Sequence, residues 1–167
     1  QEIEQMQAQG KWDEAGQLLS NEAIQLERAG ADFILLATNT MHQVAGQIKE
    51  QVNIPFLHIA DAVAEEAIKK QITRVGLLGT KYTMQLDFFK SRLETHQIDT
   101  VLPDEQNIDE LNRIIFEELV FGKTSEPSKT YYLEVMEQLK QSGAEVIVLG
   151  CTEIGLLVDE EDFDLPL

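Results

Sequence analysis

Residues 29–38 read Ala-Gly-Ala-Asp-Phe-Ile-Leu-Leu-Ala-Thr, and residues 142–151 read Ser-Gly-Ala-Glu-Val-Ile-Val-Leu-Gly-Cys. The two stretches align without a gap. Each has a helix end, a Gly-Ala-acidic triplet, four apolar residues, one small residue and one residue with a nucleophilic side chain. Such a repeat indicates two similar structural units within the chain. Thr38 and Cys151 therefore occupy equivalent positions.

Each four-residue apolar run has the length of a strand, and its unbroken apolar character is typical of a strand covered on both faces of a parallel sheet. Short apolar runs alternate with helical periodicity along the rest of the chain. Strands are predicted at 33–36, 54–58, 75–78, 100–102 and 146–149, and helices at 13–29, 41–51, 61–70, 84–96, 108–119 and 129–141. This alternation predicts an α/β fold with parallel sheets. We expect two α/β halves, residues 1–70 and 71–167.

The composition is that of an ordinary folded protein, with 43% hydrophobic and 26% charged residues among 167. Its net charge of -17 argues against nucleic acid or an anionic membrane as a partner. Local hydrogen-bond donors would have to hold any anionic ligand. The sequence has no long apolar run and no signal peptide, so we expect a soluble, cytoplasmic protein. The acidic stretch Asp159–Asp164 is predicted to be a solvated surface or a fraying tail.

Polar side chains follow several predicted strands, at the sheet edge where open α/β folds bind ligands. The segments are Thr38–Thr40, His58–Asp61, Gly79–Thr83 and Cys151–Glu153. Three of them are rich in hydroxyl groups and precede a helix start or a turn. There, hydroxyls and backbone N–H groups either cap the helix or bind carboxylates and phosphates. The recurrence of the pattern favours binding of an anion.

Cys151 is the single thiol, so a disulfide framework and a thiolate zinc cluster are excluded. A free cysteine is commonly a small buried apolar residue. At a helix N-terminus, however, the pKa of a thiol falls from about 8.5 toward neutrality. We therefore expect a reactive thiol. The three histidines lack metal-ligand spacing, so no metal is predicted, and His58 is expected to be a supporting polar group.

Three segments carry a resemblance to a known family: Ala37–His42, Leu77–Met84 and Gly150–Ile154. The sequence here resembles the aspartate/glutamate racemase superfamily, in an order and spacing that fit essentially the whole chain. The Gly-Cys-Thr-Glu segment is similar to the aspartate racemase branch, because glutamate racemases of cell-wall synthesis typically have His where Glu153 stands.

The resemblance implies two similar parallel-sheet half-domains related by a pseudo-two-fold axis, with the active site in a cleft between them. It also implies a homodimeric, cofactor-independent racemase of a small acidic amino acid, with neither pyridoxal phosphate nor a metal. Two catalytic residues, here Thr38 and Cys151, would face opposite sides of the substrate α-carbon. Two catalytic residues are needed because a single base would return the proton to the same face of the α-carbon from which it took it.

The family usually has a cysteine where Thr38 stands, and a hydroxyl is a far weaker acid than a thiol. We therefore expect unequal rates in the two directions, with Cys151 removing the proton in the better one. A lysine typical of aspartate racemases is replaced by Leu119, and Gln7 is expected to supply a polar contact instead. By resemblance, the substrate-binding residues are Gln7, Asn39, Thr40, Thr80, Thr83, Thr152 and Glu153. Glu153 would orient the thiol or the substrate amine.

Family members also have an N-terminal strand with a glycine-rich loop and a C-terminal return segment, neither of which lies in these residues. We expect these residues alone to be less stable and at most weakly active, because the missing strand would leave apolar surface exposed. Two alternatives remain. One is a related decarboxylase or isomerase, such as a single-cysteine arylmalonate decarboxylase, a maleate isomerase or a hydantoin racemase. The other is a non-catalytic protein that binds a small dicarboxylate.

Overall fold

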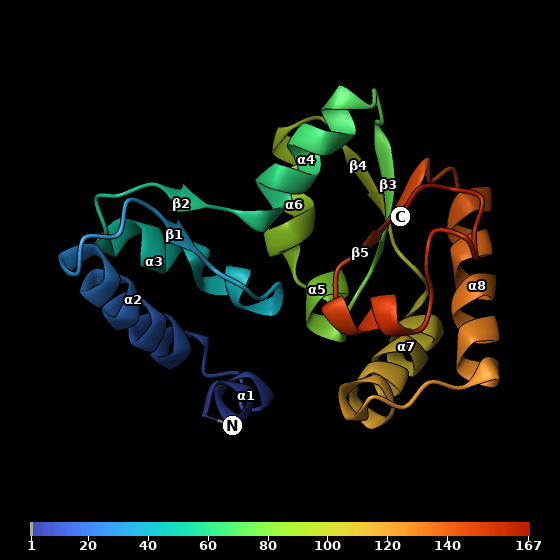
Figure 1. Cartoon of the computed structure of the whole chain (residues 1–167), viewed down its shortest axis with the longest axis horizontal. Helices are drawn as coiled ribbons and strands as arrows, with labels where there is room; N and C mark the ends of the chain where they lie inside the picture. Colours follow the sequence, from blue (N-terminus) through green and yellow to red (C-terminus); the bar gives the residue numbers. More distant parts are fainter. Residues whose placement is uncertain (1) are drawn as a thin grey trace. The chain divides into compact units, whose positions relative to one another are not determined.

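The computed structural model describes residues 2–167 and divides them into two compact units (Figure 1). The division lies between Ala62 and Val63, inside a helix, slightly before the predicted division after residue 70. The later part of that helix belongs with the second unit, because Val63 and Ala67 line the same cavity as Val75 and Val146. None of the helices in residues 2–167 has the length and apolarity needed to cross a bilayer.

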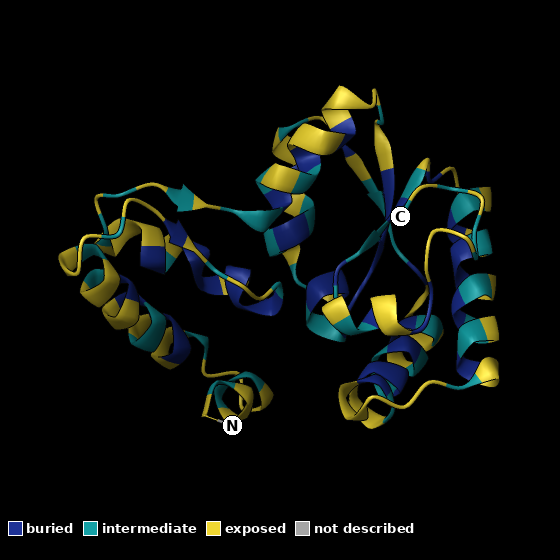
Figure 2. Cartoon of the chain, viewed as in Figure 1, coloured by how far each residue is buried: buried dark blue, intermediate teal, exposed yellow. Residues whose placement is uncertain are grey.

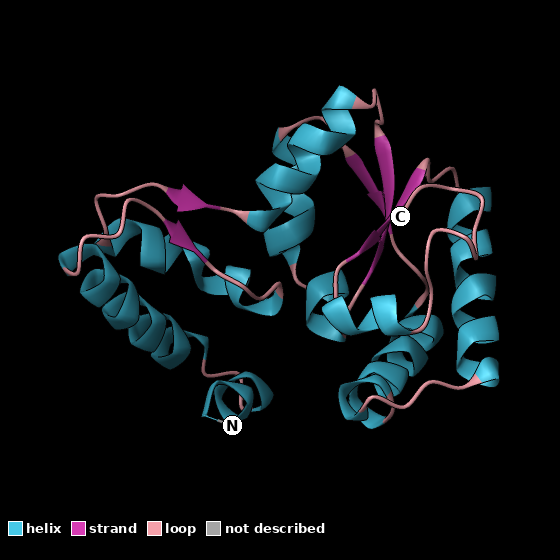
Figure 3. Ribbon diagram, in the orientation of Figure 1, coloured by secondary structure: helices cyan, strands magenta, loops and turns pink. Residues whose placement is uncertain are grey.

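The smaller unit has two short parallel strands with helices packed on them (Figure 3). Its elements are α1 (Glu2–Ala8), α2 (Trp12–Arg28), β1 (Ile34–Leu35), the 3-10 helix η1 (Thr40–Val44), α3 (Ala45–Gln51), β2 (Phe56–Leu57) and the start of α4 (Ile59–Lys69). Its core joins α2, η1 and α3 to β1 through Ala15, Ala23, Ile34, Met41, Val44 and Ile48.

The prediction that the first apolar run is covered on both faces is wrong for the described residues. Ile34 is 6% exposed, but its neighbours Phe33 and Leu35 are 52% and 62% exposed, and Leu57 on β2 is 49% exposed. Figure 2 shows that this unit has both buried and exposed positions. Alternate side chains of a strand point to opposite faces, and α2 and α3 pack only on the face that carries Ile34.

The larger unit contains a three-stranded parallel sheet in the order β4-β3-β5. Its elements after α4 are β3 (Arg74–Leu78), α5 (Lys81–Gln85), α6 (Asp87–Thr95), β4 (Asp99–Val101), α7 (Glu105–Glu117), η2 (Leu119–Phe121), α8 (Glu126–Gln141), β5 (Val146–Leu149) and η3 (Thr152–Leu156). Val75 in the central strand pairs with Thr100 on one side and Val146 on the other. The predicted α/β class with parallel sheets is confirmed.

The core of this unit lies between the sheet and helices α7 and α8. Leu111, Ile115, Tyr132 and Met136 are almost completely buried there against Ile147 of β5. The predicted single helix over residues 84–96 is wrong, because Leu86 adopts an extended conformation between α5 and α6. Each of the two helices buries its own apolar residues, Met84 from α5 and Phe89 and Leu93 from α6.

The repeated sequence has the same local conformation in both copies. Gly30 and Gly143 both have φ +94°, and the following amides close the helix ends, from Ala31 to Leu26 O (3.1 Å) and from Ala144 to Leu139 O (3.0 Å). This arrangement is a common helix C-terminal motif that favours glycine. Each copy continues into a parallel strand and then a five-residue 3-10 helix, η1 or η3.

Residues 159–167, here called the C-terminal strap, are bound to the larger unit. Lys129 Nζ lies 2.6 Å from Asp162 Oδ1, and Lys140 Nζ lies 2.5 Å from Asp164 Oδ2. The Ile147 N–H donates to Pro166 O at 3.0 Å. Asp159, Glu160, Glu161 and Asp164 are exposed, so the predicted solvated surface is confirmed for them. The alternative of a fraying tail is wrong, because two lysines of α8 and an amide of β5 hold the strap.

Gly150 allows β3 and β5 to approach closely where β5 ends. Its N–H donates to Leu78 O at 2.6 Å, and an added Cβ would lie 2.8 Å from that oxygen. Gly150→Ala is expected to lower the free energy of unfolding by about 1–3 kcal/mol, since neither backbone can yield freely. Urea unfolding measures the change. Gly155→Ala is the control, because a Cβ there meets nothing within 4 Å; equal effects of the two substitutions would contradict the prediction.

Candidate active site

The predicted site residues of the larger unit gather where the neighbouring strands β3 and β5 end. Thr80 and Thr83 follow β3, and Cys151, Thr152 and Glu153 follow β5. The two glycines at these ends provide the space for Thr83, since a Cβ at Gly79 would lie 3.1 Å from Thr83 Cβ and one at Gly150 would lie 3.2 Å from Thr83 Cγ2. The adjacency predicted from the strand ends is thus present within this unit.

Cys151 and Glu153 form a hydrogen-bonded pair. Cys151 Sγ donates to Glu153 Oε2 at 3.0 Å, and Thr152 Oγ1 donates to the same oxygen at 2.9 Å. Burial, followed by the contact with Glu153, raises the pKa of the Cys151 thiol to about 12. The hydrogen bond from Cys151 lowers the pKa of Glu153. The pair therefore rests as a neutral thiol beside a carboxylate.

The expectation that the N-terminus of a helix lowers the pKa of Cys151 is wrong. The element that follows Cys151 is a five-residue 3-10 helix rather than a longer α-helix. Burial disfavours the thiolate, and the neighbouring carboxylate disfavours it further. In the resting state, Cys151 is therefore a proton donor.

Thr80 caps α5 by binding the backbone of Thr83. Thr80 Oγ1 accepts from the Thr83 N–H at 3.3 Å, and the two hydroxyl oxygens are 3.2 Å apart. Thr83 is 1% exposed and Thr80 8%. The structure thus gives Thr80 the capping role, and it buries Thr83 inside the helix that Thr80 caps.

The predicted residues of the smaller unit gather after β1. Thr38 is exposed, and its N–H donates to Leu36 O at 2.9 Å. Asn39 precedes η1, and Thr40 begins it with 9% exposure. Gln7 on α1 reaches the same helix, because its Nε2 lies 2.9 Å from Met41 Sδ. Thr38, Asn39 and Thr40 therefore lie together after β1, and Gln7 contacts the 3-10 helix that follows them.

Sequence reasoning gave no role to His42, whose buried side chain contacts backbone groups on both sides. It is 2% exposed, its Nδ1 lies 2.7 Å from Thr38 O, and its Nε2 accepts from the Ile59 N–H at 3.2 Å. Its ring makes edge contacts with His58 and Phe56, at centroid distances of 4.4 and 5.9 Å. Burial lowers the pKa of His42. The only sequence signal was its place in the matched segment Ala37–His42.

Other features of the larger unit lie outside the predicted site. Leu119 is 1% exposed and belongs to the core. A cavity of about 510 Å³ is lined mainly by α4, β5 and the C-terminal strap, and none of the predicted site residues lines it.

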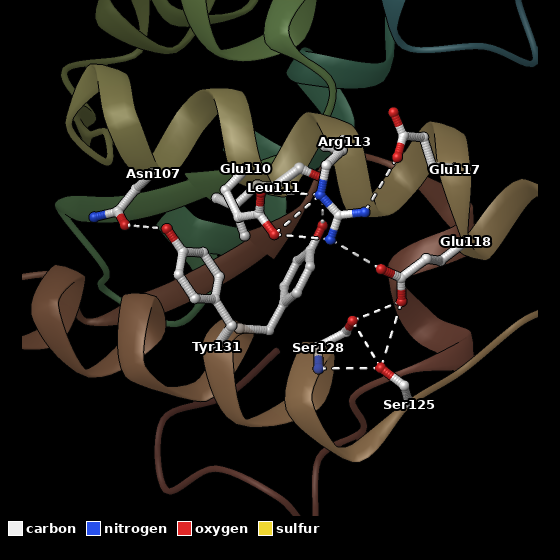
Figure 4. A network of polar contacts seen from close by, with 10 residues as sticks. Asn107, Glu110, Leu111, Arg113, Glu117, Glu118, Ser125, Ser128 and Tyr131 are labelled. Carbon is white, nitrogen blue, oxygen red and sulfur yellow. Dashed lines mark hydrogen bonds and ion pairs between the residues drawn. The ribbon is translucent and has the colours of Figure 1, made fainter.

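A polar network joins α7 to the start of α8 (Figure 4). Arg113 Nη2 contacts Glu110 at 2.8 Å and Glu118 at 2.9 Å, and Glu118 accepts from Ser128 Oγ at 2.6 Å. Hydrogen bonding from Ser128 lowers the pKa of Glu118. Ser125 caps α8 by accepting from the Ser128 N–H. The network fixes the turn between two core helices.

The parallel α/β units and the thiol–carboxylate pair at a strand end define a chain of the Asp/Glu/Hydantoin racemase family. The sequence profile of that family matches residues 1–167, and the chain belongs to it. Among curated proteins, the broad specificity amino-acid racemase RacX of Bacillus subtilis (strain 168) is 26% identical over 157 residues, which are 93% of this chain and 66% of that protein. The chain thus spans about two thirds of RacX.

Two crystal structures are similar along nearly the whole chain. One is described as a candidate Asp/Glu racemase from Yersinia pestis, with TM-score 0.94 and 48% identity over 99% of this chain and 72% of that one. The other is PH1733, an aspartate racemase homologue from Pyrococcus horikoshii OT3, with TM-score 0.83 and 40% identity over 93% of this chain and 68% of that one.

Proposed function

We propose that the protein is a cofactor-independent amino-acid racemase of a small acidic amino acid, with Thr38 and Cys151 as its two acid/base residues. Membership of the racemase family supports the reaction class. The observation that carries the proposal is the 3.0 Å contact between Cys151 Sγ and Glu153 Oε2, directly after β5. This contact joins a proton donor to a group that can accept its proton. We further propose a cytoplasmic homodimer.

The chemistry requires one proton to leave the substrate α-carbon and another to arrive on the opposite face. In one direction, the Cys151 proton first passes to Glu153 along their hydrogen bond. The thiolate then takes the α-proton, so that the C–H bond breaks and an S–H bond forms. A new C–H bond forms on the other face with the proton of the Thr38 hydroxyl. The reverse direction runs the same steps backward: the Thr38 alkoxide takes the α-proton, Cys151 gives its S–H proton to the carbon, and Glu153 returns its proton to the thiolate. Between turnovers, solvent carries the proton from Glu153 to the Thr38 alkoxide, which restores the neutral thiol and the hydroxyl of the resting state.

Hydroxyl and amide donors that follow the strands of each unit support an acidic substrate. Hydroxyls and amides of Gln7, Asn39, Thr40, Thr80 and Thr152 would bind carboxylate or amine groups, with Thr83 holding Thr80 in place. Thr152 is exposed and now donates to Glu153. Turning it toward a substrate would need only rotation of a hydroxyl. Donors placed in this way also stabilise the negative charge that develops as the α-proton leaves.

Exchange of the α-proton tests this function directly. Full-length protein is incubated in D₂O with L- and D-aspartate and with L- and D-glutamate, and the α-proton signal is followed by NMR, with inversion measured by chiral chromatography. We expect exchange and inversion for at least one pair. Binding without exchange would overturn the proposal in favour of a dicarboxylate-binding protein, and loss of CO₂ from a malonate would favour a decarboxylase.

Thr38→Cys is expected to make the two directions of the reaction more alike. Enantiomers have equal free energies, so kcat/KM must be equal in the two directions and the asymmetry must appear in kcat and KM taken separately. Since a thiol is the stronger acid, we expect the ratio of the two kcat values to shrink by about tenfold, or ~1.4 kcal/mol of barrier. Thr38→Ser, which keeps a hydroxyl, is the control. An unchanged ratio in Thr38→Cys would remove Thr38 from the acid/base pair.

A further inference from the structure

We propose that His42, held neutral with its proton on Nδ1, is a positioning residue that fixes Thr38 for proton transfer. The inference rests on the proposed racemase function. His42 joins the carbonyl of Thr38, just beyond β1, to the first amide of α4, just beyond β2. It has no place in the reaction itself, because its two ring nitrogens face backbone groups.

The two backbone partners determine the tautomer of the ring. The Ile59 N–H can only donate, so Nε2, 3.2 Å away, must be the nitrogen without a proton. The ring proton of the neutral form then lies on Nδ1. Nδ1 is 2.7 Å from Thr38 O, which can only accept. Both contacts are satisfied by one protonation state, the neutral Nδ1–H form.

The link matters because Thr38 lies beyond the last pair of the β1–β2 ladder. The β1–β2 ladder pairs Ile34 with Phe56 and Leu35 with Leu57 and goes no further along β1. Thr38 is exposed, whereas His42 is 2% exposed and packs against Phe56 and His58. A rigid, buried ring thus holds the backbone of an exposed residue. Displacement of a reacting group by about 1 Å can cost about a hundredfold in rate.

The surroundings of His42 keep it neutral. Burial is the largest influence and lowers its pKa, while the carbonyls of Thr38 and Asn39 and the charge of Asp61 on α4 act in the opposite direction. The other titratable group against the ring is His58, at the end of β2. A proton added to Nε2 would point at the Ile59 N–H, so protonation would break the link.

The consequence for pH has a definite sign. The folded-state pKa of His42 lies below its unfolded value of about 6.5. As the pH falls, the imidazole of His42 therefore binds a proton in the unfolded chain before it does so in the folded chain. The contribution of neutral His42 to stability is present above about pH 6.5 and is lost as the pH falls below that value. Inversion should show an acid limb below that pH which is absent from variants without the imidazole.

Two substitutions separate the halves of the link. His42→Asn keeps an N–H donor near the place of Nδ1 and removes the acceptor for Ile59. His42→Gln reaches the place of Nε2 and removes the donor to Thr38. We expect His42→Gln to lower inversion by about tenfold to a hundredfold, and His42→Asn to restore most of it. Exchange at the face served by Cys151 should change by less than about twofold in both, since Cys151 alone can remove and return that proton. His96→Gln, in the larger unit, is the matched control.

The experiment has a second readout that does not need activity. In ¹⁵N-labelled full-length protein at pH 7.5, long-range ¹H–¹⁵N NMR of the His42 ring should show a protonated Nδ1 and an unprotonated Nε2. A proton on Nε2, or a charged ring, would overturn the proposal, as would equal losses of exchange and inversion in His42→Gln. A wild-type protein with neither exchange nor inversion would instead overturn the racemase function. The tautomer of the His42 ring would then show by itself whether His42 joins Thr38 O to the Ile59 N–H.

Discussion

Cys151→Ala is expected to lower α-proton exchange and inversion of both enantiomers by about 10³-fold or more. The magnitude follows from the 10²–10⁴-fold contribution of a positioned acid/base group. Cys151 is the single sulfur nucleophile of the chain, and its Sγ is the atom that Glu153 contacts. Exchange in D₂O, followed by NMR, measures the loss for each enantiomer separately.

Cys151→Ser is the matched variant, because it keeps a donor to Glu153 in nearly the same volume. Its activity should also fall strongly, since a hydroxyl is a weaker acid than a thiol. Urea unfolding of both variants checks that the fold is intact. Exchange within about tenfold of the wild-type rate in Cys151→Ala would remove Cys151 from the mechanism.

Glu153→Gln is expected to lower exchange by about 10²-fold while making the thiol more reactive toward alkylating agents. The two effects have one cause. Glu153 raises the pKa of Cys151 through their hydrogen bond, so loss of its charge should bring that pKa down from about 12. The decrease will be partial, because burial is the larger cause of the shift and remains. The neutral amide, however, can no longer take the proton of the thiol.

The pH dependence of iodoacetamide modification gives the thiol pKa, and exchange in D₂O gives the activity. Glu145→Gln is the control, because it removes one carboxylate at the opposite end of β5, where Glu145 Oε2 accepts from the Thr73 N–H at 2.7 Å. That variant should lose stability and leave thiol reactivity unchanged. Faster alkylation with unchanged exchange in Glu153→Gln would show that Glu153 only holds the resting thiol.

The sequence predicted a strand best where glycines mark its ends and the folded protein covers its apolar run. β5 spans Val146–Leu149 as predicted, between two glycines that the fold requires, at a left-handed helix end and at the close approach to β3. β1 is shorter than its apolar run. The sequence did not predict this length, because a run of apolar residues does not show which of its side chains the rest of the protein will cover. The break at Leu86 was also missed, since the helical pattern continues through it.

The sequence predicted which candidate residues lie together, but it predicted their chemistry less well. That polar side chains gather at the ends of β3 and β5 followed from the parallel arrangement of neighbouring strands. The direction of the Cys151 pKa shift depended on burial and on where the Glu153 side chain points, neither of which the sequence displays. His42 was missed because its partners, Thr38 O and Ile59 N, are brought to it only by folding.

The C-terminal strap has a consequence for self-association. β5 stands last in the order β4-β3-β5, and an exposed strand margin is a template on which a second molecule can add its own strand and begin an aggregate. The Pro166 carbonyl already occupies the Ile147 amide on that margin. Proline has no N–H to offer in return, so the ladder cannot be propagated from that residue. The strap thus keeps a second molecule from pairing with β5, the strand that leads to Cys151.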